Sequence, residues 1–413
     1  MPISSPPDTI VYGSSLRAAP VEVTLQKAAT WAARYGITRI TDTTQLDRIG
    51  IPVCASIRPG AQRGSLCVSA GKGLTLAEAR IGAYMEALEL ALAEWGAAPI
   101  EVVMATPEQV LDGATRPEAI LDFCPNLEAQ IPLDEPLACV RAEDILTGET
   151  SLVPAELVFL PAPDHLVPKR HFGTNSTGLA SGNTLLEATV HGLAECIERD
   201  ITSFFNICDT SFLIPNETLP AQAAALTQQL ERADLDLYVR YQPNVFGMPW
   251  IHALISEKCH PVPLFINGGY GCHPHRSIAV VRAICEAVQS RLSIIHGGRD
   301  DLIQIHKRMR VLTEEQCEGF VRTKLAQAGN ATRTLSIDDL PDGSHRATTL
   351  QSTLEVMVEA LEAVGLKRIY RVPYTAPDAD LQVVRILVPK LELFVEGCPR
   401  VGIRLRDYAH SLP

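Results

Sequence analysis

The sequence predicts an α/β (α+β) fold in which short β-strands alternate with amphipathic helices. Apolar residues recur at helical spacing in several long stretches, and runs of β-type composition lie between them. In two places a glycine-containing turn, SAGKGLT or STGLASGNT, leads into a helix. Alternating β and α elements of this kind are typical of α/β and α+β enzyme domains.

The elements are placed in chain order by their apolar spacing and by the residues that border them. The first helix follows a Pro- and Ser-rich irregular arm, with Thr24 as its expected N-cap and Gly36 as its expected end. No low-complexity linker divides the chain. Helices are expected at residues 22–36, 76–96, 183–200, 218–235, 277–297, 313–327 and 350–365, and strands at residues 236–244, 250–257, 367–374 and 381–391.

The composition is that of a globular protein with an acidic balance. The 413 residues include 36 Lys+Arg and 48 Asp+Glu, a net charge of −12, and 46% are hydrophobic. This balance argues against nucleic acid or an anionic membrane as the main partner, because such binding depends on clustered basic residues. No secretory signal and no apolar stretch of the roughly 18 residues that span a bilayer is found.

The cysteines indicate a reducing compartment. Eleven Cys are scattered without a C-x-x-C pair, so we expect free thiols and a cytoplasmic protein. Cys272, His273 and His275 in GCHPHR form the only local metal-like cluster. We interpret this cluster as a loop, because the second half of a tetrahedral zinc site is missing.

One helix carries carboxylates on a single face with little positive charge beside them. It lies in SGNTLLEATVHGLAECIERD, residues 181–200, and only Glu195 has a basic residue four positions on, Arg199. The expected buried stripe consists of Leu186, Val190, Leu193 and Ile197. At about 100° per residue, a separate sector roughly 80° wide holds Glu187, His191, Glu195 and Glu198. A solvated acidic face is the alternative interpretation.

Two further helices repeat the arrangement. Glu86 and Glu89 share a face of the helix over 76–96, and neither has Lys or Arg four residues on. Arg282, Glu286 and Gln289 form one stripe of the helix over 277–297, for which an exposed Arg–Glu pair is the alternative. Three such helices in one chain favour cation ligation over coincidence.

The carboxylates suit two or more Mg²⁺ ions that grip a triphosphate. Magnesium usually takes one or two carboxylates and completes its octahedron with water and phosphate oxygens. SAGKGLT lacks the spacing and the Ser/Thr of a phosphate loop, and no G-x-G-x-x-G opens a helix after a strand. We therefore expect a bound nucleotide to be held by metal ions and carboxylates. His191 is a candidate ligand contact, and no Ser-His-Asp arrangement is readable.

The stretch NSTGLASGNTLLEATVHGLAECIERD closely resembles the signature of the YcaO family, whose members use ATP to activate backbone amides of peptides. The family pattern is roughly Ser-x6-Glu-x3-Gln-x3-Glu-x2-Glu-Arg. This chain supplies Glu187, Glu195, Glu198 and Arg199 at the matching places. It departs at Ala180, where Ser is usual, and at His191, where Gln is usual.

Two more segments carry the resemblance. SAGKGLTLAEARIGAYMEALEL is similar to the family's Ser-x3-Glu-x2-Glu-Arg motif through Glu86 and Glu89, with Gly82 in place of Ser and Leu90 in place of Arg. RAICEAVQSR looks like the third motif. The resemblance implies a YcaO-type fold with mixed β-sheets and a catalytic domain over residues 15–400, with an irregular arm over 1–14 and a C-terminal tail over 401–413.

The resemblance also implies the site residues and the cofactors, ATP and Mg²⁺. The expected metal ligands are Glu86, Glu89, Glu187, Glu195, Glu198 and Glu286. The expected nucleotide contacts are Arg17, Thr24, Lys72, Asn183, His191, Glu195, Arg199 and Arg282. Arg199 and the terminal carboxylate of Pro413 are the candidate catalytic groups.

The resemblance implies a mechanism in which a nucleophile attacks a peptide carbonyl. ATP then phosphorylates the resulting oxyanion, so that the oxygen leaves as phosphate. External sulfide gives a thioamide, whereas a Cys, Ser or Thr side chain of the substrate gives an azoline. TDTTQLDRIGIPVCASIRPG looks like members that work beside a TfuA-type partner in thioamide formation. An azoline-forming enzyme with an E1-like partner and a non-catalytic ATP-binding helper are the alternatives. A homodimer is expected from the family alone.

Overall fold

The computed structural model describes residues 9–110, 116–395 and 398–412. The chain divides into two compact units. The first comprises residues 1–60, 66–87 and 210–356, and the second comprises residues 61–65, 88–209 and 357–413. Two helices, α2 (Leu76–Ala93) and α8 (Leu350–Ala363), contribute residues to both units.

The first unit is built on two antiparallel sheets, ordered β3-β4-β5 and β10-β11-β12-β13, and on a short β1-β2 hairpin. Its strands are β1 (Ile10–Val11), β2 (Leu16–Arg17), β3 (Arg39–Asp42), β4 (Val53–Ile57), β5 (Val68–Lys72), β10 (Phe212–Ile214), β11 (Leu235–Tyr241), β12 (Trp250–Glu257) and β13 (Asn267–Cys272). Its helices are α1 (Val21–Arg34), α4 (Ala221–Arg232), α5 (Arg276–His296), α6 (Leu302–Arg310) and α7 (Glu314–Ala328), besides the parts of α2 and α8. The 3-10 turns are η1 (Thr44–Leu46), η5 (Asn216–Thr218), η6 (Pro263–Phe265) and η7 (Ile337–Asp339).

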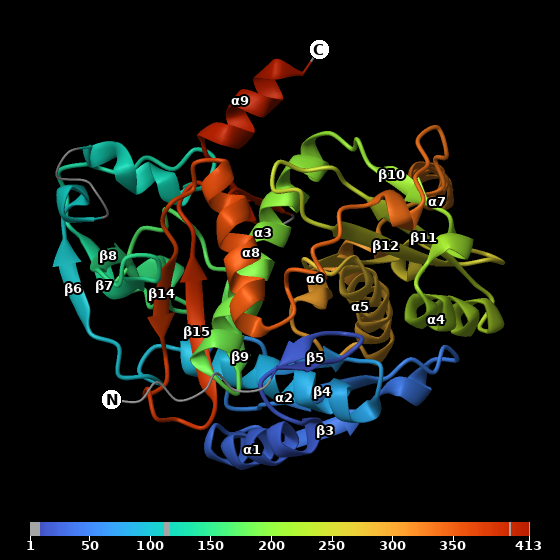
Figure 1. The fold of residues 1–413 in the computed structure, drawn as a ribbon, viewed down its shortest axis with the longest axis horizontal. Helices are drawn as coiled ribbons and strands as arrows, with labels where there is room; N and C mark the ends of the chain where they lie inside the picture. The colour runs from blue at the N-terminus through green and yellow to red at the C-terminus, as the bar shows by residue number, and fades with distance from the viewer. Residues whose placement is uncertain (1–8, 111–115, 396–397, 413) are drawn as a thin grey trace. The chain divides into compact units, whose positions relative to one another are not determined.

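Helix α5 lies at the centre of an extensive core in this unit. It packs along β13 and β12, and α4 packs against both α5 and β11 (Figure 1). Ile251, Ala253 and Ile255 alternate along β12 and are buried in this core, as the period of two in a strand requires. The register sets Ala253 opposite Val239 of β11 and Gly269 of β13.

The second unit contains a sheet ordered β6-β7-β14-β15-β9, with β8 paired to β7, and a β16-β17 hairpin. Its strands are β6 (Val102–Ala105), β7 (Leu137–Asp144), β8 (Thr150–Pro154), β9 (Leu179–Gly182), β14 (Tyr370–Pro373), β15 (Gln382–Leu387), β16 (Leu393–Val395) and β17 (Cys398–Arg400). Helix α3 (Leu185–Ile207) packs on β9, β15 and β16, and α9 (Ile403–Ser411) contacts α3. The 3-10 turns are η2 (Pro107–Gln109), η3 (Pro117–Phe123) and η4 (Ala155–Leu157).

The predicted fold class is confirmed, as are the long helices and the strand-like runs. The prediction that Thr24 is the N-cap of the first helix is wrong. Helix α1 begins at Val21 after Pro20, and the Thr24 hydroxyl donates to the Pro20 carbonyl at 3.1 Å from inside the first turn. Proline precedes the turn because its ring already fixes φ, here −58°. Helix α6 and strand β13 were not foreseen.

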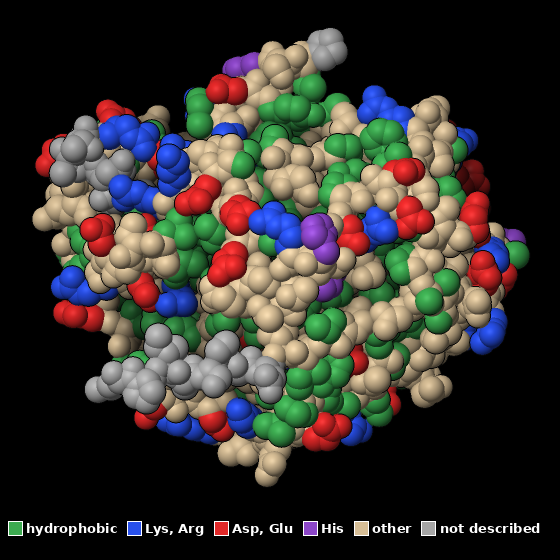
Figure 2. Space-filling model, in the orientation of Figure 1, with side chains coloured by type: hydrophobic (Ala, Val, Ile, Leu, Met, Phe, Trp, Pro, Cys, Tyr) green, Lys and Arg blue, Asp and Glu red, His purple; other side chains and the backbone are tan. Residues whose placement is uncertain are grey.

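On the face drawn in Figure 2, acidic and basic side chains are interspersed. Among the residues that the structure describes, none of the helices is long and apolar enough to cross a membrane.

Candidate nucleotide and magnesium site

Three strand–turn–helix pairs place the carboxylate-bearing helices: β5 with α2, β9 with α3 and β13 with α5 (Figure 1). In each pair a strand glycine lies against the helix backbone. A Cβ on Gly71 would come within 2.0 Å of the Ala83 nitrogen, one on Gly182 within 2.7 Å of the Ala188 nitrogen, and one on Gly269 within 2.2 Å of the Ala287 nitrogen. Each helix therefore lies directly on its strand, which a side chain at these positions would prevent.

The start of α3 is closed by a reciprocal cap that includes Glu187. The Thr184 hydroxyl accepts the Glu187 N–H at 3.1 Å, and Glu187 Oε2 accepts the Asn183 N–H at 3.0 Å and its side-chain amide at 3.2 Å. Glu187 is only 1% exposed. A predicted nucleotide contact, Asn183, and a predicted metal ligand, Glu187, are thus bonded to each other at a helix N-terminus.

Glu78 has the equivalent position on α2 and was missed at the sequence level. Its N–H donates to the Thr75 hydroxyl at 3.2 Å, and its Oε2 accepts the Leu74 N–H at 3.2 Å. The Ser14 hydroxyl donates to the same oxygen at 2.7 Å. The shared T-x-x-E spacing of TLAE and TLLE is the signal that could have found Glu78.

In the first unit, Glu286 on α5 is compensated by a residue distant in the sequence. Lys72 at the end of β5 lies 2.6 Å from Glu286 Oε2, and the Tyr270 N–H donates to Oε1 at 3.3 Å. The alternative prediction of an exposed Arg282–Glu286 pair did not include Lys72, which is a basic residue that Glu286 contacts. Arg282 is half-buried one turn earlier on α5.

Glu86, on the same unit's part of α2, is half-buried, and burial raises the pKa of its carboxyl. The charges of Arg299 and Lys72 and a hydrogen bond from the Ala70 N–H act in the opposite direction and lower it. The nearby Glu286 raises it further. Glu86, Glu286 and Lys72 consequently form one charged group in this unit, and Arg299, which the sequence did not single out, belongs to it.

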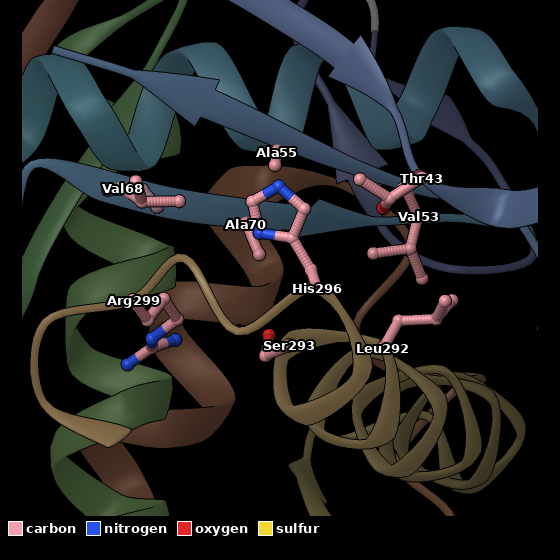
Figure 3. A pocket seen from close by; sticks show the side chains of 10 residues that line it. Thr43, Val53, Ala55, Val68, Ala70, Leu292, Ser293, His296 and Arg299 are labelled. Carbon is pink, nitrogen blue, oxygen red and sulfur yellow. The ribbon is translucent and has the colours of Figure 1, made fainter. Parts of the chain in front are cut away.

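Arg299 also lines a small cavity that lies between the β3–β5 sheet and the end of α5 (Figure 3). Ser293 and His296 face it from α5, and Val68 and Ala70 face it from β5. The Ser293 hydroxyl is buried and, among the described residues, makes no hydrogen bond. The remaining lining residues are Thr43, Val53, Ala55, Ser69 and Leu292.

The N-terminal hairpin of the first unit holds Arg17. Its Nε donates to the Ser15 hydroxyl at 2.9 Å, while Ser14 reaches Glu78. The hairpin that carries Arg17 is therefore tied to the start of α2. Thr24 lies on α1 and is buried.

In the second unit, the Glu-x-x-Glu-Arg segment of α3 is compact. Arg199 lies 3.8 Å from Glu195 Oε1 and 3.7 Å from Glu198 Oε1, and the Gly178 N–H donates to Glu195 Oε2 at 3.3 Å. Glu198 is 6% exposed. With Glu187 and Glu198 both buried, this face of α3 is not a solvated acidic surface.

Ser181 of β9 connects two more predicted site residues. Its hydroxyl donates to Glu89 Oε1, and its carbonyl lies 3.3 Å from His191 Nδ1. A carbonyl oxygen only accepts, so the neutral His191 ring carries its proton on Nδ1 and its lone pair on Nε2. That nitrogen is chemically suited to accept a hydrogen bond or to ligate a metal.

A buried arginine also lies near Glu195 of the Glu-x-x-Glu-Arg segment. Arg385 on β15 is 2% exposed and donates to the Asn175 carbonyl at 2.7 Å. Burial lowers its pKa, whereas the charge of Glu195 raises it. The first carboxylate of each Glu-x-x-Glu pair thus has an arginine from another element nearby: the half-buried Arg299 for Glu86 and the buried Arg385 for Glu195.

The donor set fits Mg²⁺ in its chemistry, because carboxylate oxygens are the ligands that this ion prefers. Within the described ranges, however, no group of three or more His, Cys, Asp or Glu side chains is arranged to hold a metal. In GCHPHR, Cys272 ends β13 and His275 is the N-cap residue of α5. His275 Nε2 lies 2.6 Å from the Ala347 carbonyl, and His273 Nδ1 accepts the His275 N–H at 2.9 Å. Pro413 lies outside the described residues.

Comparison with known proteins decides the family. Residues 70–392 match the sequence model of the family described as YcaO cyclodehydratase, ATP- and Mg²⁺-binding. The chain belongs to the YcaO family. The predicted cofactors, ATP and Mg²⁺, are therefore those of the family to which it belongs, and the predicted family membership is confirmed.

Two uncharacterized proteins are similar to this YcaO chain over most of its length. One, from Methanothermobacter thermautotrophicus, is 34% identical over 379 residues, which cover 90% of this chain and 94% of that protein. The other, from Rhizobium leguminosarum bv. trifolii, is named for its place in the tfuA 3′ region. It is 33% identical over 383 residues, covering 88% of this chain and 85% of that protein.

Solved structures agree with the family. The YcaO protein from Methanopyrus kandleri bound with AMPPCP and Mg²⁺ superposes with a TM-score of 0.74 and 25% identity, covering 95% of this chain and 97% of that one. A heterocyclase in complex with substrate and cofactor has a TM-score of 0.70 at 20% identity, covering 98% of this chain and 56% of that one. At that identity the second likeness shows the fold alone.

Proposed function

We propose that this YcaO chain activates a peptide backbone amide by ATP- and Mg²⁺-dependent O-phosphorylation, and that the product is a thioamide made beside a TfuA-like partner. Family membership and the likeness to a YcaO protein bound with AMPPCP and Mg²⁺ support the use of ATP. The relative in the tfuA 3′ region is the single observation that favours the thioamide over other products.

The proposal assigns metal ligation to the buried and half-buried glutamates. Mg·ATP, when bound, supplies the phosphoryl group that makes the amide oxygen a leaving group. The proposed ligands are Glu86, Glu89, Glu187, Glu195, Glu198 and Glu286. Lys72 and Arg199 already lie beside Glu286 and the Glu195–Glu198 pair, so they offset carboxylate charge in this structure.

The basic residues are proposed to contact the phosphates. Arg199 and Arg282 present guanidinium groups suited to phosphate oxygens, and Arg199 would stabilise charge as the phosphoryl group transfers. Lys72 has a flexible stem and can exchange a carboxylate partner for a phosphate. Arg17, Thr24, Asn183 and His191 are proposed nucleotide contacts, and Pro413 is a proposed catalytic residue.

Azoline formation is the second candidate, favoured by the description of the family as cyclodehydratases. The deciding experiment combines the chain with Mg·ATP, sulfide, a TfuA-like partner and a candidate peptide, and analyses the peptide by mass spectrometry. Replacement of one oxygen by sulfur supports the proposal. The azoline is tested by the same reaction with an E1-like partner in place of the TfuA-like one. Loss of one water molecule at a Cys, Ser or Thr of the peptide supports this candidate.

A non-catalytic ATP-binding helper is expected to give a different result in the same experiment. Such a protein binds Mg·ATP but releases no phosphate beyond the background with peptide and partner present. The comparison of bound nucleotide with phosphate released therefore separates the enzyme from the helper.

A further inference from the structure

Ser181 of β9 contacts side chains from two of the carboxylate-bearing helices. Strand β9 pairs with β15, where Ser181 is opposite Val383, and α3 packs on β9. The serine is buried, at 6% exposure. Its hydroxyl donates to Glu89 Oε1 on α2, and its carbonyl lies 3.3 Å from His191 Nδ1 on α3. Ser181, Glu89 and His191 all belong to the second unit, so one strand residue holds a side chain from each helix.

The hydrogen bond from Ser181 orients the half-buried Glu89 carboxylate. A glutamate side chain can adopt several rotamers, and a bond to a buried strand residue favours the one that reaches it. Hydrogen bonds to an ionised acceptor are roughly twice as strong as those between neutral groups. A carboxylate offers about four lone-pair sites, so one donated hydroxyl does not use up its capacity to bind a cation. The serine therefore fixes where the carboxylate lies and leaves its chemistry as a ligand intact.

A hydroxyl on an adjacent residue of β9 could not make the same bond. Successive side chains of a strand point to opposite faces, so the side chain of Ala180 leaves the strand on the face opposite to that of Ser181. At Gly182 there is no room for a side chain, because a Cβ would come within 2.7 Å of the Ala188 nitrogen. The contact with Glu89 therefore depends on the residue type at position 181.

We propose that Ser181 is a positioning residue for Glu89, whose carboxylate it holds in the orientation that ligates Mg²⁺. The inference rests on the proposed function, since Glu89 is there a magnesium ligand. Ser181 itself contacts neither ATP nor Mg²⁺ in this role, and it acts through the Glu89 carboxylate. Replacement of a residue that hydrogen-bonds a metal ligand typically lowers metal affinity by about 10- to 100-fold.

The test measures how ATP binding depends on Mg²⁺, by calorimetric titration of ATP into the full chain at increasing Mg²⁺ concentrations. In Ser181→Ala, the Mg²⁺ concentration that gives half of the maximal ATP affinity should rise by about 10- to 100-fold. At saturating Mg²⁺ the ATP affinity should return toward that of the wild type, because excess metal compensates for a poorly oriented ligand. ATP affinity lowered equally at every Mg²⁺ concentration would indicate a merely structural defect and would overturn the proposal.

Two conservative variants separate the hydrogen bond from the packing of the side chain. Ser181→Thr keeps the hydroxyl on a β-branched residue that suits a strand, and it should recover most of the wild-type response to Mg²⁺. Ser181→Cys has nearly the same shape but offers only a weak donor, so it should resemble Ser181→Ala. Ser181→Cys decides the question if thermal denaturation shows that Ser181→Ala is unfolded, and a wild-type response in this variant would overturn the proposal.

The matched control is Ser256→Ala. Ser256 is buried in β12, and its hydroxyl donates to the Glu257 carbonyl at 3.3 Å, so this variant also removes a buried hydroxyl and should respond to Mg²⁺ as the wild type does.

A double-mutant cycle with Glu89→Gln shows whether Ser181 acts through Glu89. If it does, Ser181→Ala adds little to the effect of Glu89→Gln on the Mg²⁺ response. Effects that add in full would overturn the positioning role, as would a wild-type response in folded Ser181→Ala, and both results leave the proposed function intact. A wild-type chain that binds no Mg·ATP would overturn the proposed function and this role together.

Discussion

Asp200 is a buried charge whose partners anchor the C-terminal helix. It directly follows Arg199, is 1% exposed, and lies 2.6 Å from Arg404 of α9. Its Oδ1 also accepts the Glu392 N–H at 2.7 Å. Glu392 in turn accepts the N–H groups of Gly402 and Leu405 at the start of α9. The segment after the Glu-x-x-Glu-Arg motif is therefore bonded directly to the helix that precedes Pro413.

Arg404→Met is expected to destabilise the second unit by about 3–5 kcal/mol, because it leaves a buried carboxylate without its cation. Arg406→Met, exposed on the same helix, is the control and is expected to have little effect. Chemical denaturation of both variants measures the difference. An equal, small change in both would show that Asp200 does not depend on Arg404.

The same variant has a predicted pH dependence. Burial raises the pKa of Asp200 from 3.8 to about 6, although Arg404 and the Glu392 N–H lower it. Because the folded pKa is above the unfolded one, the contribution of Asp200 to stability is full below pH 3.8 and is lost as pH rises through about 6. Without Arg404 the folded pKa rises further. Arg404→Met should therefore lose more stability at pH 8 than at pH 5.

At the scale of elements, the glycines of β5, β9 and β13 decide where the carboxylate helices lie. Gly71→Ala would set a Cβ 2.0 Å from the Ala83 nitrogen and 2.2 Å from the Ala79 oxygen, both backbone atoms of α2. Overpacking of this kind costs about 1–3 kcal/mol and occasionally more. Because α2 must shift, Mg·ATP affinity should fall as well.

Gly60→Ala is the matched control, since a Cβ there meets nothing within 4 Å. Denaturation and ATP titration of the two variants provide the measurement. If Gly71→Ala were as stable as Gly60→Ala and bound nucleotide equally, α2 would not depend on close contact with β5.

These elements also show what the sequence can and cannot predict. Helices α2, α3 and α5 are long and strongly periodic, so their residues and carboxylate stripes could be placed from the sequence alone. Strand β13, NGGYGC, has three glycines and little β-type composition, and α6 has only nine residues. Helix α9 begins after Gly402 and carries few apolar residues, so it was described only as a tail.

The cations could not be predicted for a different reason. Lys72 and Glu286 are 214 positions apart, and Arg299 follows α5 in a loop. Sequence spacing shows a partner three or four residues away on one helix, but only the tertiary fold brings in a partner from another element. Carboxylates without a basic residue nearby on the same helix therefore indicated an unusual helix face, but the basic residues that balance their charge could not be identified from the sequence.

At the scale of the whole molecule, nucleotide binding is linked to the stability of the folded chain. A ligand that binds only the folded chain stabilises it by mass action, by about 2.7 kcal/mol at 100 times Kd. With a net charge of −12, the chain offers little attraction to ATP without a divalent cation. Mg·ATP should therefore raise the unfolding temperature more than ATP in EDTA or Mg²⁺ alone.

Glu198→Gln tests whether this stabilisation depends on the carboxylates. Glu198 is buried, and glutamine keeps its shape while removing the charge that a magnesium ligand needs, so the shift with Mg·ATP should largely disappear. Glu231→Gln, exposed on α4, should keep the full shift. Thermal unfolding of the three proteins with each ligand measures this. If Mg·ATP raised the unfolding temperature of all three proteins equally, Glu198 would not be a magnesium ligand. If only Glu198→Gln lost this increase, nucleotide binding would depend on the buried face of α3.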